Sequence, residues 1–201
     1  MRIVSISGTI DSGKTTAIKE LITIFAAQGK RSAVIVNEDG EETYDDNFIS
    51  SQKVSVEHLR GGWLGCSLAA SLVELKKKLK KSINPDFLFL EPSEMIVTKE
   101  LHNVTKMGLR DIQYDIGPVI TLIDGPSFSF NWEERPKLLL GQMQDVDRVA
   151  LSRTDMIDSK QIEHIRKTLD LAGNNLLLLS KHNNSSINEL AQQILAMDQE
   201  T

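Results

Sequence analysis

The chain has 201 residues, which fits one folded domain with room for a full hydrophobic core. A formal net charge of −5 gives no general attraction to nucleic acid or to anionic membranes, so neither is expected as a partner. The single cysteine, Cys66, excludes an internal disulfide, and a reducing cytoplasm is the expected location. We expect no secretion signal, and no apolar stretch approaches the roughly 18 residues that cross a bilayer.

Short apolar runs alternate with amphipathic stretches along the chain. Strands are predicted at 3–7, 33–37, 54–59, 87–90, 118–123, 148–151 and 176–179. Helices are predicted at 15–28, 64–81, 133–144, 161–171 and 187–197. Strands that are apolar throughout indicate burial on both faces, and helices between them indicate a parallel sheet. The predicted fold is one three-layer α/β domain over residues 1–201, with a mostly parallel central sheet flanked by helices.

A glycine-rich loop follows the first predicted strand. Its sequence, GTIDSGKT, matches G-x-x-x-x-G-K-[ST] in full and stands between a strand and a helix, as a P-loop does. Backbone N–H groups of such a loop surround phosphate oxygens, and the following helix adds its positive dipole end. We expect Lys14 to reach the β and γ phosphates and the Thr15 hydroxyl to ligate Mg²⁺. The predicted phosphate-binding residues are Gly8, Thr9, Ile10, Asp11, Ser12, Gly13, Lys14, Thr15 and Thr16.

Asp11 places a negative charge inside this anion-binding loop. An outward, solvated carboxylate is the expectation, and a contact with a cation from a partner is the alternative.

A second polar segment, LSRTD, follows the strand predicted at 148–151 and resembles the guanine-reading N-K-x-D motif of GTPases. The Asp155 carboxylate can accept hydrogen bonds from guanine N1–H and from its exocyclic amine, whereas adenine presents an acceptor at N1. Arg153 stands where lysine is usual, and its stem can pack over the base in the same way. Ser152 replaces the usual asparagine, so weakened affinity is expected. Ser180 and Lys181, after the next strand, are further candidate base contacts.

Longer segments resemble the CobW/HypB/UreG family of metal-chaperone GTPases, and most of all its CobW-like branch. The segment VIVNEDGE at 34–41 is similar to the family's V-I-V-N-E-F-G-E, and FLFLEPS at 87–93 to its I-L-I-E-x-[ST]-G. The run from Gly141 to Asp147, leading into VALSRTD, resembles the family's Q-I-x-x-A-D before N-K-T-D. Together these similarities cover nearly the whole chain, and the resemblance implies a nucleotide-binding domain alone, so the C-terminal domain of CobW-like proteins is not expected.

The resemblance implies a GTPase, using GTP and Mg²⁺, that assists maturation of a metal-centre or corrinoid protein. It implies catalytic roles for Lys14, Glu38, Asp39 and Glu91, with Thr15, Glu38 and Glu91 near Mg²⁺. Capping of the turns that follow is the alternative for these carboxylates. The client protein is unidentified, and a nucleotide-dependent homodimer is expected by analogy.

The chain departs from the family pattern at two places. The family's G-G-C-x-C-C matches Gly61 to Cys66 here, where Cys66 is the one cysteine that remains. One thiolate falls short of the about four ligands of a tight zinc site, so Cys66 is expected to be a packed thiol, with a cargo-metal ligand as the alternative. Glu94 stands where the family has a glycine near the γ-phosphate, which favours slow hydrolysis.

Two other functions are consistent with the same loop. One is a nucleotide-gated interaction module with little hydrolysis, which Ser152, Glu94 and the missing cysteines favour. The other is a small-molecule kinase that uses ATP, against which Asp155 argues.

The basic run Lys76, Lys77, Lys78, Lys80 and Lys81 predicts a solvated helix face, with a docking patch for an acidic partner as the alternative. Trp132 and the segment 128–130 are expected in a loop after Asp124, where partner contacts and lid packing are both open.

Overall fold

The computed structural model describes residues 1–9, 11–37, 44–59, 66–106, 114–170, 176–183 and 185–199, with the backbone alone at 66–69, 104, 198 and 199. Its elements, in chain order, are β1 (Arg2–Gly8), α1 (Lys14–Ala27), β2 (Ser32–Val36), α2 (Asp46–Gln52), β3 (Ser55–His58), α3 (Cys66–Ser82), β4 (Phe87–Glu91), α4 (Thr98–Lys106), β5 (Asp115–Asp124), α5 (Phe128–Glu134), α6 (Pro136–Met143), β6 (Arg148–Ser152), α7 (Ser159–Thr168), β7 (Leu176–Leu178) and α8 (Ser185–Gln199).

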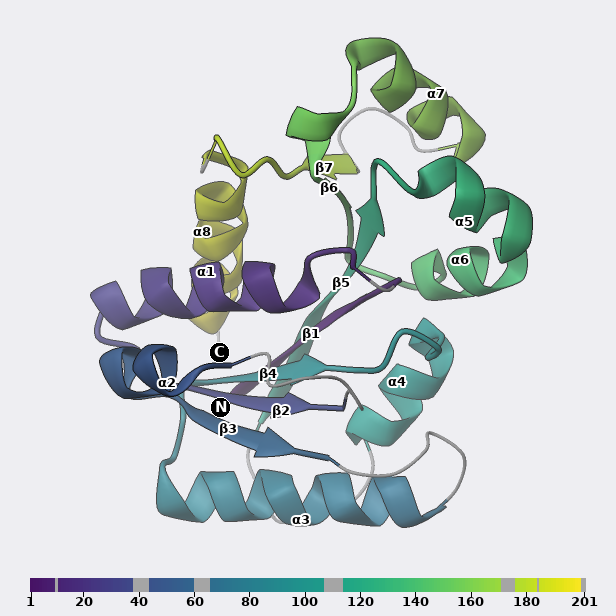
Figure 1. The fold of residues 1–201 in the computed structure, drawn as a ribbon. Coiled ribbons are helices and arrows are strands. Elements are labelled where there is room, and N and C mark those ends of the chain that lie inside the picture. Colours follow the sequence, from purple (N-terminus) through teal and green to yellow (C-terminus); the bar gives the residue numbers. More distant parts are fainter. Residues whose placement is uncertain are drawn as a thin grey trace.

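The strands form one seven-stranded sheet in the order β3-β2-β4-β1-β5-β6-β7, and each described pairing is parallel. The predicted α/β fold with a parallel sheet is confirmed. Strand β4 lies between β2 and β1, so β1 and β2 are not neighbours although they follow each other in the chain (Figure 1). The pairing places Val36 of β2 beside Glu91 of β4. The carboxyl ends of these strands therefore meet at one edge of the sheet, where ligands of such folds bind.

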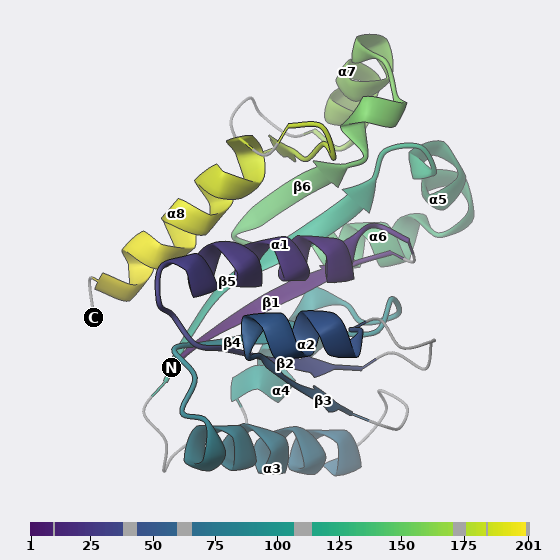
Figure 2. The ribbon, with the colours of Figure 1, turned by 60° about the vertical axis from the view of Figure 1, so that its left-hand side comes forward.

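Helices cover the sheet on both faces, which gives three layers. Helices α1, α2 and α8 lie over one face, and α3 lies over the other (Figure 2). On the first face Phe25 of α1 packs its ring 4.5 Å from that of Phe87 and 5.8 Å from that of Phe89. On the second face Leu72 and Leu79 of α3 belong to the cluster formed by β2 and β4. Within the described ranges, no helix has the length and apolar character that a bilayer span requires.

The predicted helix at 133–144 is wrong in its extent. The structure has two helices here, α5 and α6, which meet at Arg135 and Pro136. Proline fits the first position of a helix, because it lacks an N–H that this position leaves unused, and it cannot continue a helix that precedes it. The aromatic residues expected in a loop lie in α5 instead: Phe128 is buried and stacks on Trp132, while Phe130 is exposed. Helices α2 and α4 were not predicted at all.

The lysine run of α3 is not a uniformly solvated face. Lys78 and Lys81 are exposed, but Lys76 is fully buried and donates from Nζ to the carbonyl of Thr105 at 2.9 Å. Its acceptor lies in the last turn of α4, where the helix dipole favours a cation. Burial lowers the pKa of Lys76 to about 8. The expectation of a solvated face is therefore wrong at Lys76, which instead joins α3 to α4.

Candidate functional site

The predicted phosphate loop connects β1 to α1 at the carboxyl edge of the sheet. Gly8 has φ 145°, and a Cβ there would lie 2.3 Å from the carbonyl oxygen of Leu122 on β5. Gly13 caps α1 with φ 85°, a conformation that glycine adopts without strain. The two glycines thus meet different needs: Gly8 permits close approach to β5, and Gly13 permits the turn into the helix.

Several polar side chains of this loop are buried. The hydroxyls of Thr9 and Ser12 are buried and have no hydrogen-bond partner among the described residues. Lys14 is 4% exposed, and its Nζ donates to the carbonyls of Thr9 at 3.1 Å and Gly8 at 3.4 Å. A phosphate group offers charged acceptors to the same ammonium and the same hydroxyls. The loop therefore has the donor set that a polyphosphate requires.

Asp11 is exposed, as expected, and has φ 56°. Its charge acts on Arg153, whose pKa is raised first by its hydrogen bond to Asp124 and to a smaller extent by the Coulombic attraction of Asp124 and Asp11.

A buried carboxylate stands beside the loop at the end of β4. Glu91 is 1% exposed, and its Oε1 accepts a hydrogen bond from the Thr15 hydroxyl at 2.5 Å. Its Oε2 accepts one from the Tyr44 hydroxyl at 2.6 Å. The structure therefore brings together Thr15 and Glu91, two of the three residues predicted near Mg²⁺. The contact of Tyr44 with Glu91 was missed. Tyr44 stands just before Asp45, which caps α2, and nothing in the local sequence indicates that its hydroxyl reaches the end of β4.

The donor chemistry at this place fits a magnesium ion that arrives with a nucleotide. Magnesium bound in this way takes one or two protein oxygens, phosphate oxygens and several waters. The Thr15 hydroxyl would ligate the ion, and the Glu91 carboxylate would hold that hydroxyl or an ion-bound water. The ion supplies charge neutralisation of the phosphates when bound.

The segment that follows β4 is fixed by α6. Gln142 is fully buried, and its Nε2 donates to the carbonyls of Glu94 at 2.7 Å and Ile96 at 3.3 Å. The backbone carbonyl of Gln142 accepts from the hydroxyls of Thr98 and Thr121, both at 2.6 Å. The Glu94 side chain lies with Oε1 3.9 Å from Nη1 of Arg135, a loose ion pair. In the sequence, Gln142 stood out only as part of the run 141–147 that resembles the family. Its role in fixing this segment was missed.

The two loops that are predicted to contact the base lie together. The backbone N–H of Lys181 donates to Oδ1 of Asp155 at 3.1 Å, and Thr154 Oγ1 donates to the carbonyl of Leu179 at 3.0 Å. The Lys181 N–H also lowers the pKa of the Asp155 carboxyl, as does the Ser180 hydroxyl to a smaller extent. Asp155 therefore stays ionised at neutral pH, as an acceptor of two guanine donors must be.

Arg153 and Ser152 of the same segment are directed toward β5. Arg153 has φ 53°, and its Nε donates to Oδ1 of Asp124 at 2.5 Å. Asp124 ends β5, is fully buried, and also accepts from the backbone N–H of Ser127 at 2.9 Å. Ser152 donates to the carbonyl of Ile123 at 3.2 Å. Sequence reasoning did not identify Asp124 as a partner, although its position at a strand end was a usable signal.

Some predicted residues cannot be placed. Ile10, Glu38 and Asp39 lie outside the described residues. Cys66 begins α3, but the description gives its backbone alone. Across the described ranges, no group of three or more His, Cys, Asp or Glu side chains is arranged to hold a metal ion. The cargo-metal interpretation of Cys66 remains a prediction.

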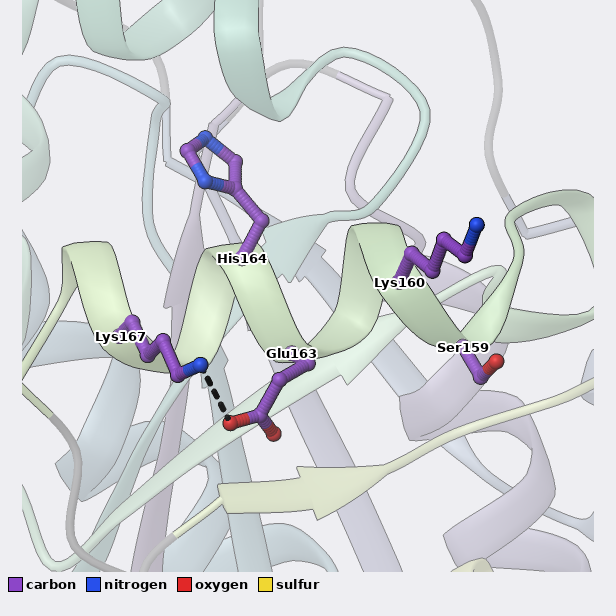
Figure 3. A pocket seen from close by; sticks show the side chains of 5 residues that line it. All are labelled: Ser159, Lys160, Glu163, His164 and Lys167. Carbon is purple, nitrogen blue, oxygen red and sulfur yellow. Dashed lines mark ion pairs between the residues drawn. The ribbon is translucent and has the colours of Figure 1, made fainter.

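A shallow depression lies along α7, lined by Ser159, Lys160, Glu163, His164 and Lys167 (Figure 3). All five side chains come from one helix and are exposed, and Lys167 Nζ pairs with Glu163 Oε1 at 3.5 Å. None of the predicted site residues lines it. This surface therefore adds nothing to the phosphate and base sites.

Known proteins share both the sequence pattern and the fold. Residues 2–177 match the family model described as CobW/HypB/UreG, nucleotide-binding domain. The chain is 28% identical to the zinc chaperone YjiA of Escherichia coli strain K12 in an alignment of 174 positions that covers 80% of this chain and 52% of that protein. It is 23% identical to the zinc chaperone CobW of a Sinorhizobium species in an alignment of 191 positions that covers 80% of this chain and 53% of that protein. The chain thus spans about half the length of these curated relatives.

Solved structures show the same fold at lower identity. HypB from Helicobacter pylori in complex with nickel superposes with a TM-score of 0.64 at 17% identity, over 98% of this chain and 87% of that chain. Zn(II)-bound YjiA GTPase from E. coli superposes with a TM-score of 0.64 at 20% identity, over 91% of this chain and 58% of that chain. Because its family model covers most of the sequence, the chain belongs to the CobW/HypB/UreG family, whose nucleotide-binding domain it contains.

Proposed function

We propose that this chain binds GTP with Mg²⁺ at the loop 8–16 and hydrolyses it to drive maturation of a metal-containing client protein. The observation that supports this most is the bond of 2.5 Å between the Thr15 hydroxyl and the Glu91 carboxylate beside that loop. A hydroxyl and a carboxylate joined next to a phosphate-binding backbone form the protein side of a magnesium–nucleotide site.

Guanine selectivity in this proposal rests on Asp155. Its carboxylate lies at the same edge of the sheet as the phosphate loop, held by the N–H of Lys181. An ionised carboxylate accepts from guanine and meets the N1 acceptor of adenine unfavourably. Ser180 and Lys181 complete the base-contacting loops.

The metal-delivery half of the proposal rests on relatives. YjiA and CobW are zinc chaperones by name, and the HypB structure was solved with nickel. A metal-centre protein or a corrinoid protein is the proposed client class, and zinc or nickel is the proposed cargo. Cys66 is the one cysteine of this chain that a cargo metal could use; a packed thiol is the expectation for it, and a cargo ligand with further ligands from a second copy is the alternative.

The direct test is equilibrium binding of GTP, GDP and ATP to the full chain with Mg²⁺, followed by phosphate release over many turnovers. We expect GTP and GDP to bind at least about tenfold more tightly than ATP, the scale of one or two hydrogen bonds. Failure of GTP to bind at millimolar concentration would refute the proposal. Adding Zn²⁺ or Ni²⁺ to the turnover assay then tests the link to metal delivery.

A second candidate is a nucleotide-gated interaction module with little hydrolysis. Gln142 and Arg135 engage Glu94 at the position where relatives have glycine, and the Ser152 hydroxyl donates to β5. Tight GTP binding without measurable phosphate release, together with partner binding that differs between GTP and GDP, would favour this module over the GTPase.

A further inference from the structure

Glu91 is the meeting point of three segments that are distant in sequence. It ends β4, and it accepts from Thr15 in the first turn of α1 and from Tyr44 just before α2. Each oxygen of the carboxylate has one of these hydroxyls, at 2.5 and 2.6 Å. With both oxygens held, the carboxylate has little freedom to rotate.

The bond to Glu91 also orients Thr15. A hydroxyl has one hydrogen and two lone pairs, so a hydroxyl that donates to a carboxylate turns its lone pairs elsewhere. A cation can then be received by the Thr15 oxygen without loss of the bond to Oε1. The carboxylate makes that oxygen a stronger ligand, as partners of metal ligands commonly do.

Tyr44 is itself held firmly from two helices. It is 4% exposed, and its ring lies 6.2 Å from that of Phe48 in α2. The ammonium of Lys19, one turn beyond Thr15 in α1, lies 5.5 Å from the Tyr44 ring and 3.4 Å from the Asp45 carboxylate. The direction of the Tyr44 hydroxyl is therefore set by packing as well as by Glu91.

These contacts separate two roles of one side chain. The ring fills the hydrophobic core below α1, a role that phenylalanine could perform equally well. The hydroxyl adds a hydrogen bond to the carboxylate that stands beside the phosphate loop. A charge-assisted hydrogen bond from a fixed donor restricts rotation of the carboxylate and so gives it a defined orientation.

We propose that Tyr44 is a positioning residue of the magnesium site, which holds Oε2 of Glu91 so that Oε1 stays on the Thr15 hydroxyl. The inference rests on the proposed function, since it assumes that the magnesium–nucleotide binds at the loop 8–16. Through Tyr44, binding of the divalent cation is coupled to the start of α2.

The test compares Tyr44→Phe with Tyr114→Phe in the full chain. Tyr114, the chain's other tyrosine, precedes β5 at the opposite edge of the sheet and packs against the cluster under α3. A fluorescent GDP analogue is bound first in EDTA, and Mg²⁺ is then titrated at a fixed analogue concentration. The midpoint of the magnesium-dependent rise in affinity is the readout, and it requires no turnover.

We expect Tyr44→Phe to leave the affinity in EDTA within about twofold of wild type and to raise the magnesium midpoint by about threefold to tenfold, at or below the roughly 10–100-fold seen when a direct partner of a metal ligand is removed. Tyr114→Phe should match wild type in both. Glu91→Gln should raise the midpoint further, and adding Tyr44→Phe to it should change little, because the two residues act through one carboxylate.

An unchanged midpoint in Tyr44→Phe would overturn the inference and leave Tyr44 as a packing residue. A loss of analogue affinity in EDTA equal to the loss with Mg²⁺ would also overturn it, since the effect would then not depend on the cation. If wild type binds no analogue under either condition, the proposed function itself has failed.

Discussion

The phosphate side and the base side of the site are built in different ways. On the phosphate side the Lys14 and Glu91 side chains are 4% and 1% exposed. Lys14 donates to the Thr9 carbonyl of its own loop, and Glu91 accepts from the Thr15 hydroxyl of α1. On the base side the Asp155 side chain is 19% exposed, and its partners, the Lys181 N–H at 3.1 Å and His182 Nε2 at 4.0 Å, belong to exposed residues of a loop. Buried polar groups are costly to leave without partners, whereas exposed ones exchange with water. Changes on the phosphate side should therefore affect folding and binding together, and changes on the base side should affect selectivity alone.

The largest effect is expected from Lys14→Ala. Removal of the ammonium should weaken GTP binding by about 1.5–3 kcal/mol, the scale of a hydrogen bond to a charged group. Isothermal titration calorimetry measures this loss, and Lys160→Ala on the exposed surface of α7 is the control. Equal affinity in the two variants would show that the loop 8–16 is not the phosphate site.

Lys76 tests whether burial of a charge governs stability away from the site as well. Its pKa is about 8 in the folded protein against an ordinary value of 10.5, so between these values the unfolded chain binds the additional proton and stability rises with pH. Below pH 8 both states are protonated, and Lys76 adds no slope. We expect a gain of roughly 1–3 kcal/mol between pH 8 and 10, which urea unfolding at each pH would measure.

Lys76→Met should flatten this slope, while Lys81→Met, an exposed change in the same helix, should keep it. If both variants retain the wild-type slope, the ammonium of Lys76 is not the group responsible.

Asp155→Asn addresses the base side. An amide can still accept one hydrogen bond but no longer carries the charge that two guanine donors favour, so GTP-over-ATP preference should fall by roughly tenfold, about 1.4 kcal/mol. Because the asparagine amide oxygen can still accept from the Lys181 N–H, the urea midpoint should barely change. Competition of GTP and ATP for a fluorescent analogue measures the preference. Retained preference would remove Asp155 from base reading, and a large fall in stability would contradict the contrast between the two sides.

The smallest effect is expected from Ser152→Asn. Asparagine has a longer amide than the serine hydroxyl, which here donates to Ile123 at 3.2 Å. A gain in GTP affinity of about 0.5–1 kcal/mol is expected if the amide reaches the nucleotide or the phosphate loop. Titration calorimetry of Ser152→Asn beside Ser152→Ala separates this gain from loss of the serine bond. Equal affinities in both variants would show that position 152 does not limit binding.

Much of the fold could be predicted because its signals are local. Apolar runs gave the strands, and GTIDSGKT with LSRTD gave the positions of the two loops. Helix α2 was missed because it has only seven residues, and its two apolar residues, Phe48 and Ile49, are adjacent and show no helical period. The break between α5 and α6 was missed although Pro136 marks it.

The contacts across the sheet could not be predicted in the same way. Lys76 was predicted to be solvated with the other lysines of its run. It lies four residues after Leu72 and three before Leu79, and therefore on the face of α3 that packs against the sheet. The bonds of Tyr44 to Glu91 and of Arg153 to Asp124 join segments whose distance depends on the strand order. Local pattern carries no information about such pairs.

The position of β4 between β1 and β2 has a consequence for how the chain folds. The two strands made first cannot pair with each other, so the middle of the sheet closes only when residues 87–91 arrive between them. Such non-local closure is slow compared with helix formation. Since the same insertion brings Glu91 to Thr15, a magnesium–nucleotide would bind tightly only to chains that have completed it. By mass action the nucleotide would then stabilise the folded sheet relative to intermediates in which residues 87–91 are not yet paired.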